Sequence, residues 1–212
     1  MPESAEDYFA RIAAAQDADG RIPLDPEGVL AWDVFPFEAE GLRLKPGPVP
    51  GPERVRSGED PATCQCAQPP ARGPREPFGV VWEDEHFLVK APPPSGAPLM
   101  LSVVTREHLD VPEMDADLAA AFGRLHVALV ASVEELPSVG RCHVMRIGDG
   151  GAHAHWWFLA RPVNLPLVLG SFMVDWDDFL PPLPLDVWAE NAAFVAQRLH
   201  ERLGGRAVTA LT

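Results

Sequence analysis

The sequence predicts an α+β domain built on an antiparallel sheet, and the order of its elements carries that prediction. Short runs of β-branched and apolar residues come first, an amphipathic helix follows, and a hairpin and a second amphipathic helix complete the chain. A doubly wound fold would instead alternate strands with helices throughout. Of the 212 residues, 47% are hydrophobic, which is enough for one core, and the mean hydropathy of −0.03 is typical of a soluble protein.

The N-terminal part, residues 1–77, is expected to be an extension that precedes the domain. A short amphipathic helix over 6–16 and an apolar, strand-like stretch over 30–37 are its predicted elements. From 45 to 77 the composition shifts to proline, glycine and arginine with almost no large apolar side chain, so this stretch cannot bury enough surface to fold alone. The domain is therefore predicted to occupy residues 78–212.

A series of strands opens the predicted domain. The runs 79–82 and 86–89 lie on either side of an acidic turn, and their closeness indicates a hairpin. A proline-rich turn follows, and the run 99–105 is β-branched and apolar, as expected of a further strand. The first half of the domain is thus predicted to be strands alone.

Two helices and a second hairpin complete the prediction. Asp115 is expected to cap a helix that runs to about Glu135, because apolar residues recur along it at spacings of three and four and form a stripe that would face a sheet. The hairpin that follows has a tight turn rich in glycine, which permits positive φ. The remaining elements are two strands, the turn between them and the last helix: 141–147, 152–159, 148–151 and 186–203. Together these elements predict a sheet of about five strands with two main helices.

The charge balance limits the partners. Acidic side chains number 31 against 17 basic ones, which gives a net charge of −14 and a pI near 4.8. So acidic a surface repels phosphate backbones and anionic lipids, and this excludes nucleic acid and membrane surfaces as main partners. The N-terminal stretch has no basic region followed by an apolar run, so we expect a cytoplasmic protein. Three cysteines are too few for a disulfide framework, and they are expected to be reduced thiols or metal ligands.

The segment Gly151–Pro162 carries the main candidate for chemistry. Side chains of a strand alternate between its two faces, so His153, His155, Trp157 and Arg161 would share one face. Two imidazoles and a guanidinium on one face suit a phosphate ester, because arginine pairs well with phosphate. We therefore expect the ligand to be a small-molecule phosphate ester or a nucleotide.

Several neighbours are expected to hold the phosphate. The backbone N–H groups of the glycine-rich turn upstream of the histidines can form an anion-binding nest. Gly150, Gly151 and Arg161 are therefore predicted phosphate-binding residues. His143, on the strand predicted to pair with the histidine strand, would line the same pocket, or it would be an ordinary histidine of the core or of an edge.

The same segment resembles the signature of the histidine triad superfamily. It reads His153-Ala-His155-Trp-Trp157-Phe-Leu-Ala-Arg161, while residues 81–88 look like the first hairpin of that family and residues 103–108 are similar to the end of its third strand. The resemblance implies a histidine triad-like fold, nucleotidyl transfer to His155, an orienting role for His153, and a homodimer. The chemistry is reasonable, because a neutral imidazole is a good nucleophile at pH 7.

The chain departs from the family pattern at two places. Trp157 stands where the third histidine is expected, and an indole donates one N–H but neither accepts a proton nor carries charge. Prolines between Pro92 and Pro94 occupy the positions that hold ribose in the family. The catalytic set His155, His153 and Trp157 is therefore predicted to belong to a phosphoric ester hydrolase or nucleotidyltransferase, or alternatively to a degenerate nucleotide-binding or interaction protein.

The resemblance also implies a structural zinc ion. Zinc-bearing members of the superfamily combine two cysteines with two histidines, and the matching residues here are Cys64, Cys66, His108 and His153. Two sulfurs and two imidazoles are a normal closed zinc shell, which would tie the proline-rich loop to the sheet. Since the spacing is Cys-x-Cys rather than Cys-x-x-Cys, two free surface thiols are the alternative. A cupin-type metal site at the two triad histidines ranks last, because no glutamate follows them at the required distance.

Overall fold

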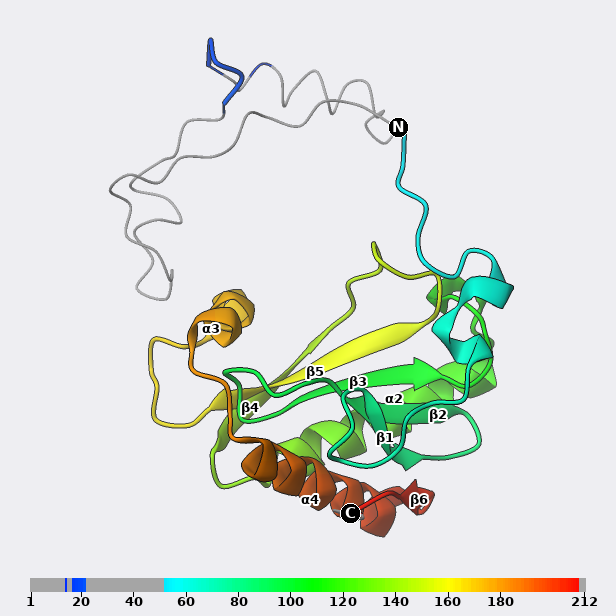
Figure 1. Ribbon diagram of the computed structural model, residues 1–212, viewed down its shortest axis with the longest axis vertical. Coiled ribbons are helices and arrows are strands. Elements are labelled where there is room, and N and C mark those ends of the chain that lie inside the picture. Colours follow the sequence, from blue (N-terminus) through cyan, green and yellow to red (C-terminus); the bar gives the residue numbers. More distant parts are fainter. Residues whose placement is uncertain (1–13, 15–16, 22–51, 210–212) are drawn as a thin grey trace. The chain divides into compact units, whose positions relative to one another are not determined.

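The computed structural model describes residue 14, residues 17–21 and residues 52–209. The chain divides into two compact units, Met1–Arg54 and Val55–Thr212, and the second contains the whole sheet (Figure 1). The helix and the apolar stretch predicted within the first forty residues lie almost wholly outside the described residues. The second unit begins well before residue 78, so the segment 55–77 belongs to the same unit as the sheet.

A six-stranded sheet forms the centre of the second unit. Its strands lie in the order β4-β5-β3-β2-β1-β6, and every neighbouring pair is antiparallel. This confirms the predicted α+β class, with one strand more than expected, because the short β6 pairs with β1 after the last helix. The strands are β1 Gly79–Glu83, β2 Phe87–Ala91, β3 Met100–Thr105, β4 Val139–Met145, β5 His155–Pro162 and β6 Arg206–Ala207.

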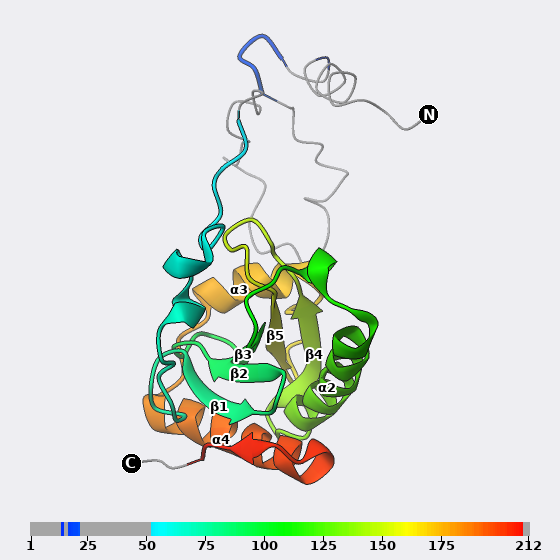
Figure 2. The ribbon, with the colours of Figure 1, turned by 90° about the vertical axis from the view of Figure 1, so that its right-hand side faces the viewer.

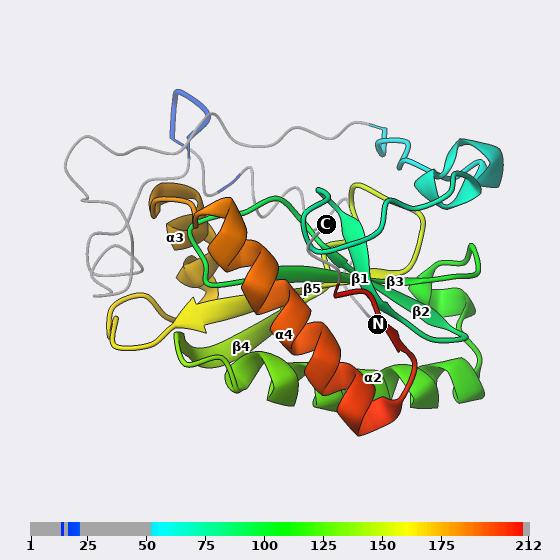
Figure 3. The same ribbon diagram turned by 60° about the horizontal axis from the view of Figure 1, so that its bottom comes forward.

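Two long helices, α2 (Ala116–Glu134) and α4 (Leu185–Leu203), pack on each other and cover one face of the sheet (Figure 3). The carboxylate of Asp115 accepts a hydrogen bond from the Leu118 N–H at 2.8 Å, which confirms the predicted N-cap of α2. By length and composition α2 is apolar enough to cross a membrane, but its apolar stripe packs into the core beneath the sheet. The main core thus lies between the helices and one face of the sheet.

Alternation along β5 decides which side chains reach that core. Trp156 and Phe158 point toward the helices, and Trp156 stacks on Phe122 of α2 with ring centroids 3.9 Å apart. Leu159 points the other way and belongs to a smaller apolar cluster beside the short helix α3 (Met173–Phe179). At the other end of this second face, no α-helix of the described residues covers the sheet (Figure 2).

The acidic run 175–178 lies within α3. The carboxylate of Asp177 is only 5% exposed and accepts a hydrogen bond from the Ala97 N–H at 2.6 Å. That buried contact joins α3 to the turn that leads into β3.

The glycine-rich stretch 148–151 also differs from the prediction. It is part of a nine-residue connection between β4 and β5 rather than a tight turn, and none of its glycines has positive φ. The connection is instead held by Ser57, whose N–H donates to the Gly150 carbonyl oxygen at 3.0 Å and whose carbonyl oxygen accepts from the Ala152 N–H at 2.9 Å. These bonds form an isolated parallel bridge between Ser57 and Gly151 outside the sheet, and β5 begins at His155.

Candidate functional site

A cavity of about 660 Å³ opens on the sheet face that α2 and α4 leave free, between the strands and the segment 55–77. Its walls come from that segment and from the β4–β5 connection. Its floor consists of two rows of directly paired residues from β2, β3 and β5: Leu88, Val104 and His155 in one row, and Lys90, Ser102 and Trp157 in the other.

His155 has one ring nitrogen fixed and one left free. Its Nδ1 lies 2.7 Å from the carbonyl oxygen of His153, so Nδ1 carries the proton and donates it to that oxygen. The backbone of Gly151 packs against the same edge of the ring, since a Cβ placed there would be 3.7 Å from Cε1. The lone pair therefore resides on Nε2, which is the atom of this ring available for chemistry in the cavity.

The ring of His153 is fixed in the opposite sense. Its Nε2 lies 2.8 Å from the carbonyl oxygen and 3.0 Å from the hydroxyl of Thr105, and that hydroxyl donates to the carbonyl oxygen of Glu107 at 2.9 Å. Nε2 is therefore protonated, and the lone pair of Nδ1 faces the Cys64 sulfur at 3.3 Å. Burial is the largest cause that lowers the pKa of His153, so the ring is neutral at pH 7.

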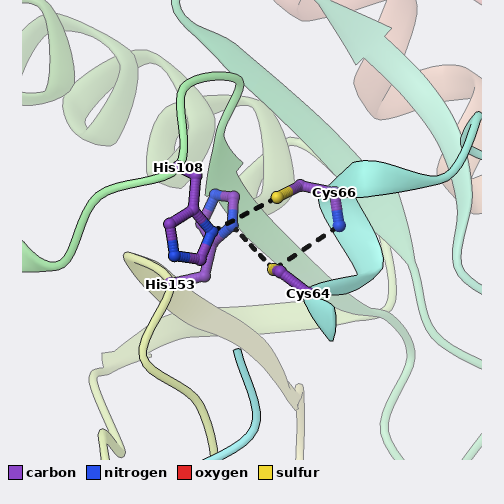
Figure 4. A group of neighbouring side chains, drawn as sticks. All are labelled: Cys64, Cys66, His108 and His153. Atoms are coloured by element: carbon purple, nitrogen blue, oxygen red, sulfur yellow. Dashed lines mark hydrogen bonds between the residues drawn. The ribbon is translucent and has the colours of Figure 1, made fainter. Parts of the chain in front are cut away.

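Four donors converge at one corner of the cavity (Figure 4). We call them the Cys–His cluster: Cys64, Cys66, His108 and His153. The Cys66 sulfur lies 3.3 Å from Nδ1 of His108, and the four donor atoms all lie within 4.8 Å of one another. Two 3-10 helices of the segment 55–77, Pro61–Thr63 and Gln65–Ala67, position the cysteines at the ends of β2 and β3 (Figure 1): Cys64 lies between the two helices, and Cys66 lies within the second.

The Cys–His cluster fits a tetrahedral zinc ion. Zn–S bonds of about 2.3 Å and Zn–N bonds of about 2.0 Å place the sulfur and nitrogen corners of a tetrahedron roughly 3.5 Å apart, close to the two 3.3 Å separations here. Burial, followed by the neighbouring Cys64, raises the pKa of the Cys66 thiol to about 11. A zinc ion would therefore have to displace a proton from this sulfur. The predicted ligand set is thus brought together, although the Cys-x-Cys spacing is shorter than the family pattern.

The structure does not bring Arg161 and His143 to the cavity. Arg161 lies six residues beyond His155 on β5, roughly 20 Å along the strand. Its guanidinium lies over Gly140 and donates to the Pro162 carbonyl oxygen at 3.2 Å. His143 pairs with Leu159 further along the same strands. The predicted shared face exists, but the extended backbone carries these two side chains away from His155.

The remaining predicted residues lie at the cavity. Gly150 and Gly151 line its wall, and Trp157 lines its floor with its ring nearly perpendicular to that of His155, at 87°. With no positive φ in the stretch 148–151, the predicted anion-binding nest is absent from this part of the chain. The third cysteine, Cys142, lies elsewhere on β4, and burial raises the pKa of its thiol to about 12.

One carboxylate fixes the walls of the cavity. Asp110 accepts hydrogen bonds from Arg56 at 2.6 Å and from Arg146 at 2.7 Å, which joins the segment 55–77 to the start of the β4–β5 connection. Burial alone would raise the pKa of Asp110, but the hydrogen bonds from Arg56, from the Val111 N–H and from Arg146 hold it at about 2. The Asp110 carboxylate therefore stays ionised, and paired with Arg56 and Arg146, at any physiological pH.

Sequence reasoning missed Lys90, whose side chain is half-buried in the cavity floor beside Ser102. One signal was present, because Lys90 is the only charged residue in the otherwise apolar strand β2. It also missed Thr105, since nothing in the sequence shows that its carbonyl oxygen would fix the tautomer of His153.

An antiparallel α+β fold thus presents a histidine with a free Nε2 beside a candidate Cys₂His₂ metal site. The chain is similar to solved histidine triad structures, the family that its sequence resembles. A histidine triad protein from Marinobacter aquaeolei is 16% identical, with 58% of this chain and 89% of that chain covered and a TM-score of 0.47.

Two further solved structures are comparable. A hypothetical histidine triad nucleotide-binding protein from Sulfolobus tokodaii is 15% identical, with 61% of this chain and 89% of that chain covered and a TM-score of 0.46. A Zn-bound histidine triad family protein from Mycobacterium smegmatis is 17% identical, with 56% and 84% covered and a TM-score of 0.41. No protein-family model and no curated protein sequence matches the chain. Likenesses this distant carry no assignment of function, which depends on the geometry of the site.

Proposed function

We propose that the protein is a phosphoric ester hydrolase or nucleotidyltransferase that acts on a nucleotide-like phosphate through a phosphohistidine-type intermediate at His155. The observation that carries the proposal is the tautomer of His155, since its Nδ1 proton is held by the His153 carbonyl oxygen and its Nε2 lone pair is left in the cavity. A nucleophile needs this arrangement, because an imidazole attacks only through an unprotonated nitrogen.

The reaction would proceed in two displacements. Nε2 of His155 attacks the phosphorus, a P–N bond forms, and the P–O bond to the leaving group breaks with its electron pair on the leaving oxygen. Water, or the phosphate of a second substrate, then attacks the same phosphorus and breaks the P–N bond, which restores the imidazole. The ring becomes positively charged in the intermediate. The hydrogen bond that Nδ1–H donates to the His153 carbonyl oxygen therefore becomes stronger.

Trp157 restricts the leaving group. An indole cannot protonate the departing oxygen, so this position supplies no acid to the first displacement. Leaving groups that are stable as anions, such as a phosphate or an aryl oxide, should therefore react, whereas simple alkyl oxides should not.

The decisive experiment is covalent trapping. Incubation with α-³²P-labelled nucleoside triphosphates and with the 4-nitrophenyl ester of thymidine 5′-phosphate should give an acid-labile label on His155 and release of 4-nitrophenolate. His155→Ala should reduce turnover by about 10⁴-fold or more without a change in melting temperature. His86→Ala, which removes an exposed imidazole outside the cavity, is the matched control and should behave as wild type. Undiminished turnover in the His155 variant would refute the proposal.

A second candidate function is a zinc-stabilised nucleotide-binding or interaction protein, and Trp157 is the observation that favours it. Such a protein would be stabilised by nucleotides in a thermal shift assay without any product or label. The zinc ion itself belongs to both candidates. When bound to the Cys–His cluster it would supply structural stability, by tying the segment 55–77 to the sheet.

A further inference from the structure

The charges around the cavity are opposite to those of the protein as a whole. The chain carries a net charge of −14, yet the described residues that line the cavity include three cations and no carboxylate. The three are Arg72, Lys90 and Arg106. A hollow with low-dielectric walls and one sign of charge concentrates ligands of the other sign, so the cavity as a whole favours an anion.

Two of these cations already have a partner. Arg72 and Arg106 both pair with the buried carboxylate of Glu83, at 2.6 and 2.5 Å. Glu83 also binds Arg206, so one carboxylate faces three guanidinium groups and leaves a net positive charge at this edge of the cavity. Arg72 and Arg106 are therefore fixed by Glu83, and they add to the positive potential of the cavity without a free guanidinium for a ligand.

Lys90 is different, because no carboxylate among the described residues pairs with it. It stands on β2 with its side chain half-buried among Leu88, Ser102 and the cysteine-bearing segment. Burial is the main cause that lowers its pKa, and the only groups that oppose this effect are the sulfurs of Cys64 and Cys66. In a zinc site the charge of the ion balances that of two thiolates, so Lys90 would keep an uncompensated charge whether or not the metal is present. A half-buried ammonium without a counter-ion is costly unless a ligand supplies one.

The position of Lys90 relative to His155 sets the geometry of that ligand. Their strands, β2 and β5, are separated by β3 alone, so the two backbones lie two strand spacings apart, roughly 10 Å. Between them the floor is formed by Val104 and Ser102, and it carries no charge. A ligand with its phosphoryl group at Nε2 of His155 therefore reaches Lys90 with a second anionic group by extending across this uncharged floor.

From these contacts we infer that the cavity selects substrates with two anionic groups: the phosphoryl group attacked by His155, and a second phosphate or carboxylate on the remote part of the molecule that binds Lys90. The inference rests on the proposed function for the role of the first group. At the far end of the cavity, the expected ligand carries an acidic group rather than an uncharged base or sugar. Lys90 is then the residue that determines specificity.

Binding and turnover test the inference separately. For binding, the probes are alkyl phosphonates of graded length that end in a carboxylate, each compared with its own methyl ester; phosphonates resist hydrolysis, so catalysis is not involved. For turnover, the probes are 4-nitrophenyl alkyl phosphodiesters with the same two kinds of end. Wild-type protein should prefer the carboxylate by about tenfold or more in Kd and in kcat/KM at the best length.

Two variants of Lys90 test whether this residue causes the preference for the carboxylate over the ester. Lys90→Met should bring the ratio between carboxylate and ester close to one, and Lys90→Arg should retain the preference. Arg75→Met removes one exposed positive charge outside the cavity and is the matched control for net charge.

The outcomes separate the two claims. A wild-type protein that binds carboxylate and ester equally well, or a Lys90→Met variant that keeps the preference, would overturn the inference and leave His155 chemistry intact. A preference in binding that depends on Lys90, with no turnover of any diester, would support the second anion site and count against the proposed function.

Discussion

Glu83 is a buried side chain that accepts hydrogen bonds from three arginines that come from distant parts of the chain. Arg72 lies in the segment 55–77, Arg106 follows β3, and Arg206 belongs to β6. Burial alone would raise the pKa of Glu83, but these hydrogen bonds lower it from 4.5 to about 2. The same carboxylate thus closes one edge of the sheet and fixes two of the cations of the cavity.

The linkage between pH and stability follows from this shift. A lowered pKa contributes stability that is fully present above pH 4.5 and is lost as the pH falls toward 2. Glu83→Gln should lower the free energy of unfolding at pH 7 by about 1–3 kcal/mol, because three guanidinium groups lose their common partner. The difference between the variant and wild type should shrink as the pH falls from 4.5 to 2, which denaturant titrations at several pH values would measure.

Glu113→Gln would serve as the control for that measurement, since its carboxylate is exposed and caps a short helix only. An undiminished difference between Glu83→Gln and wild type at pH 2 would contradict the assignment of the low pKa to Glu83.

At the scale of elements, the segment 55–77 has little apolar surface of its own, and three kinds of contact hold it on the sheet. Its backbone pairs with β1 through Val80, whose N–H donates to the Ala71 carbonyl oxygen at 2.8 Å. Gly79 permits this approach, because a Cβ there would come within 2.3 Å of the Gly73 carbonyl oxygen. The ion pairs of Arg56 and Arg72 are the second contact, and the Cys–His cluster is the third.

Removal of the metal should therefore loosen this segment before the sheet unfolds. The purified protein should contain about one zinc ion per chain by elemental analysis, and Cys64→Ser should lose it. Backbone amides of 57–72 should then exchange with solvent about tenfold faster or more, while those of β2 and β3 stay protected, as measured by hydrogen exchange. Cys142→Ser, which lies outside the cluster, should keep both the zinc and the protection.

At the scale of the whole molecule, the boundary between the units lies at Arg54/Val55. A fragment 55–212 should fold with a melting temperature within a few degrees of that of the full chain, because it retains all contacts of the sheet with the segment 55–77. A fragment 78–212 should be destabilised by several degrees and should not bind zinc, since it lacks both cysteines and Arg72. Calorimetry and metal analysis of the two fragments would test the position of the boundary.

Local patterns predicted most of this architecture. The stripe of α2 with its Asp115 cap and the alternation along β5 depend on neighbours in sequence, and both are confirmed. The segment 55–77 could not be placed this way, because its stability comes from ion pairs and sulfur contacts with residues far along the chain. For the same reason the sequence shows a shared face for His155 and Arg161, but not that the cavity ends long before Arg161.

His153 has two partners through two different groups. Its ring faces Cys64, and its carbonyl oxygen holds the Nδ1 proton of His155. A displacement of His153 by a change at the Cys–His cluster would therefore also alter the hydrogen bond that fixes the tautomer of His155.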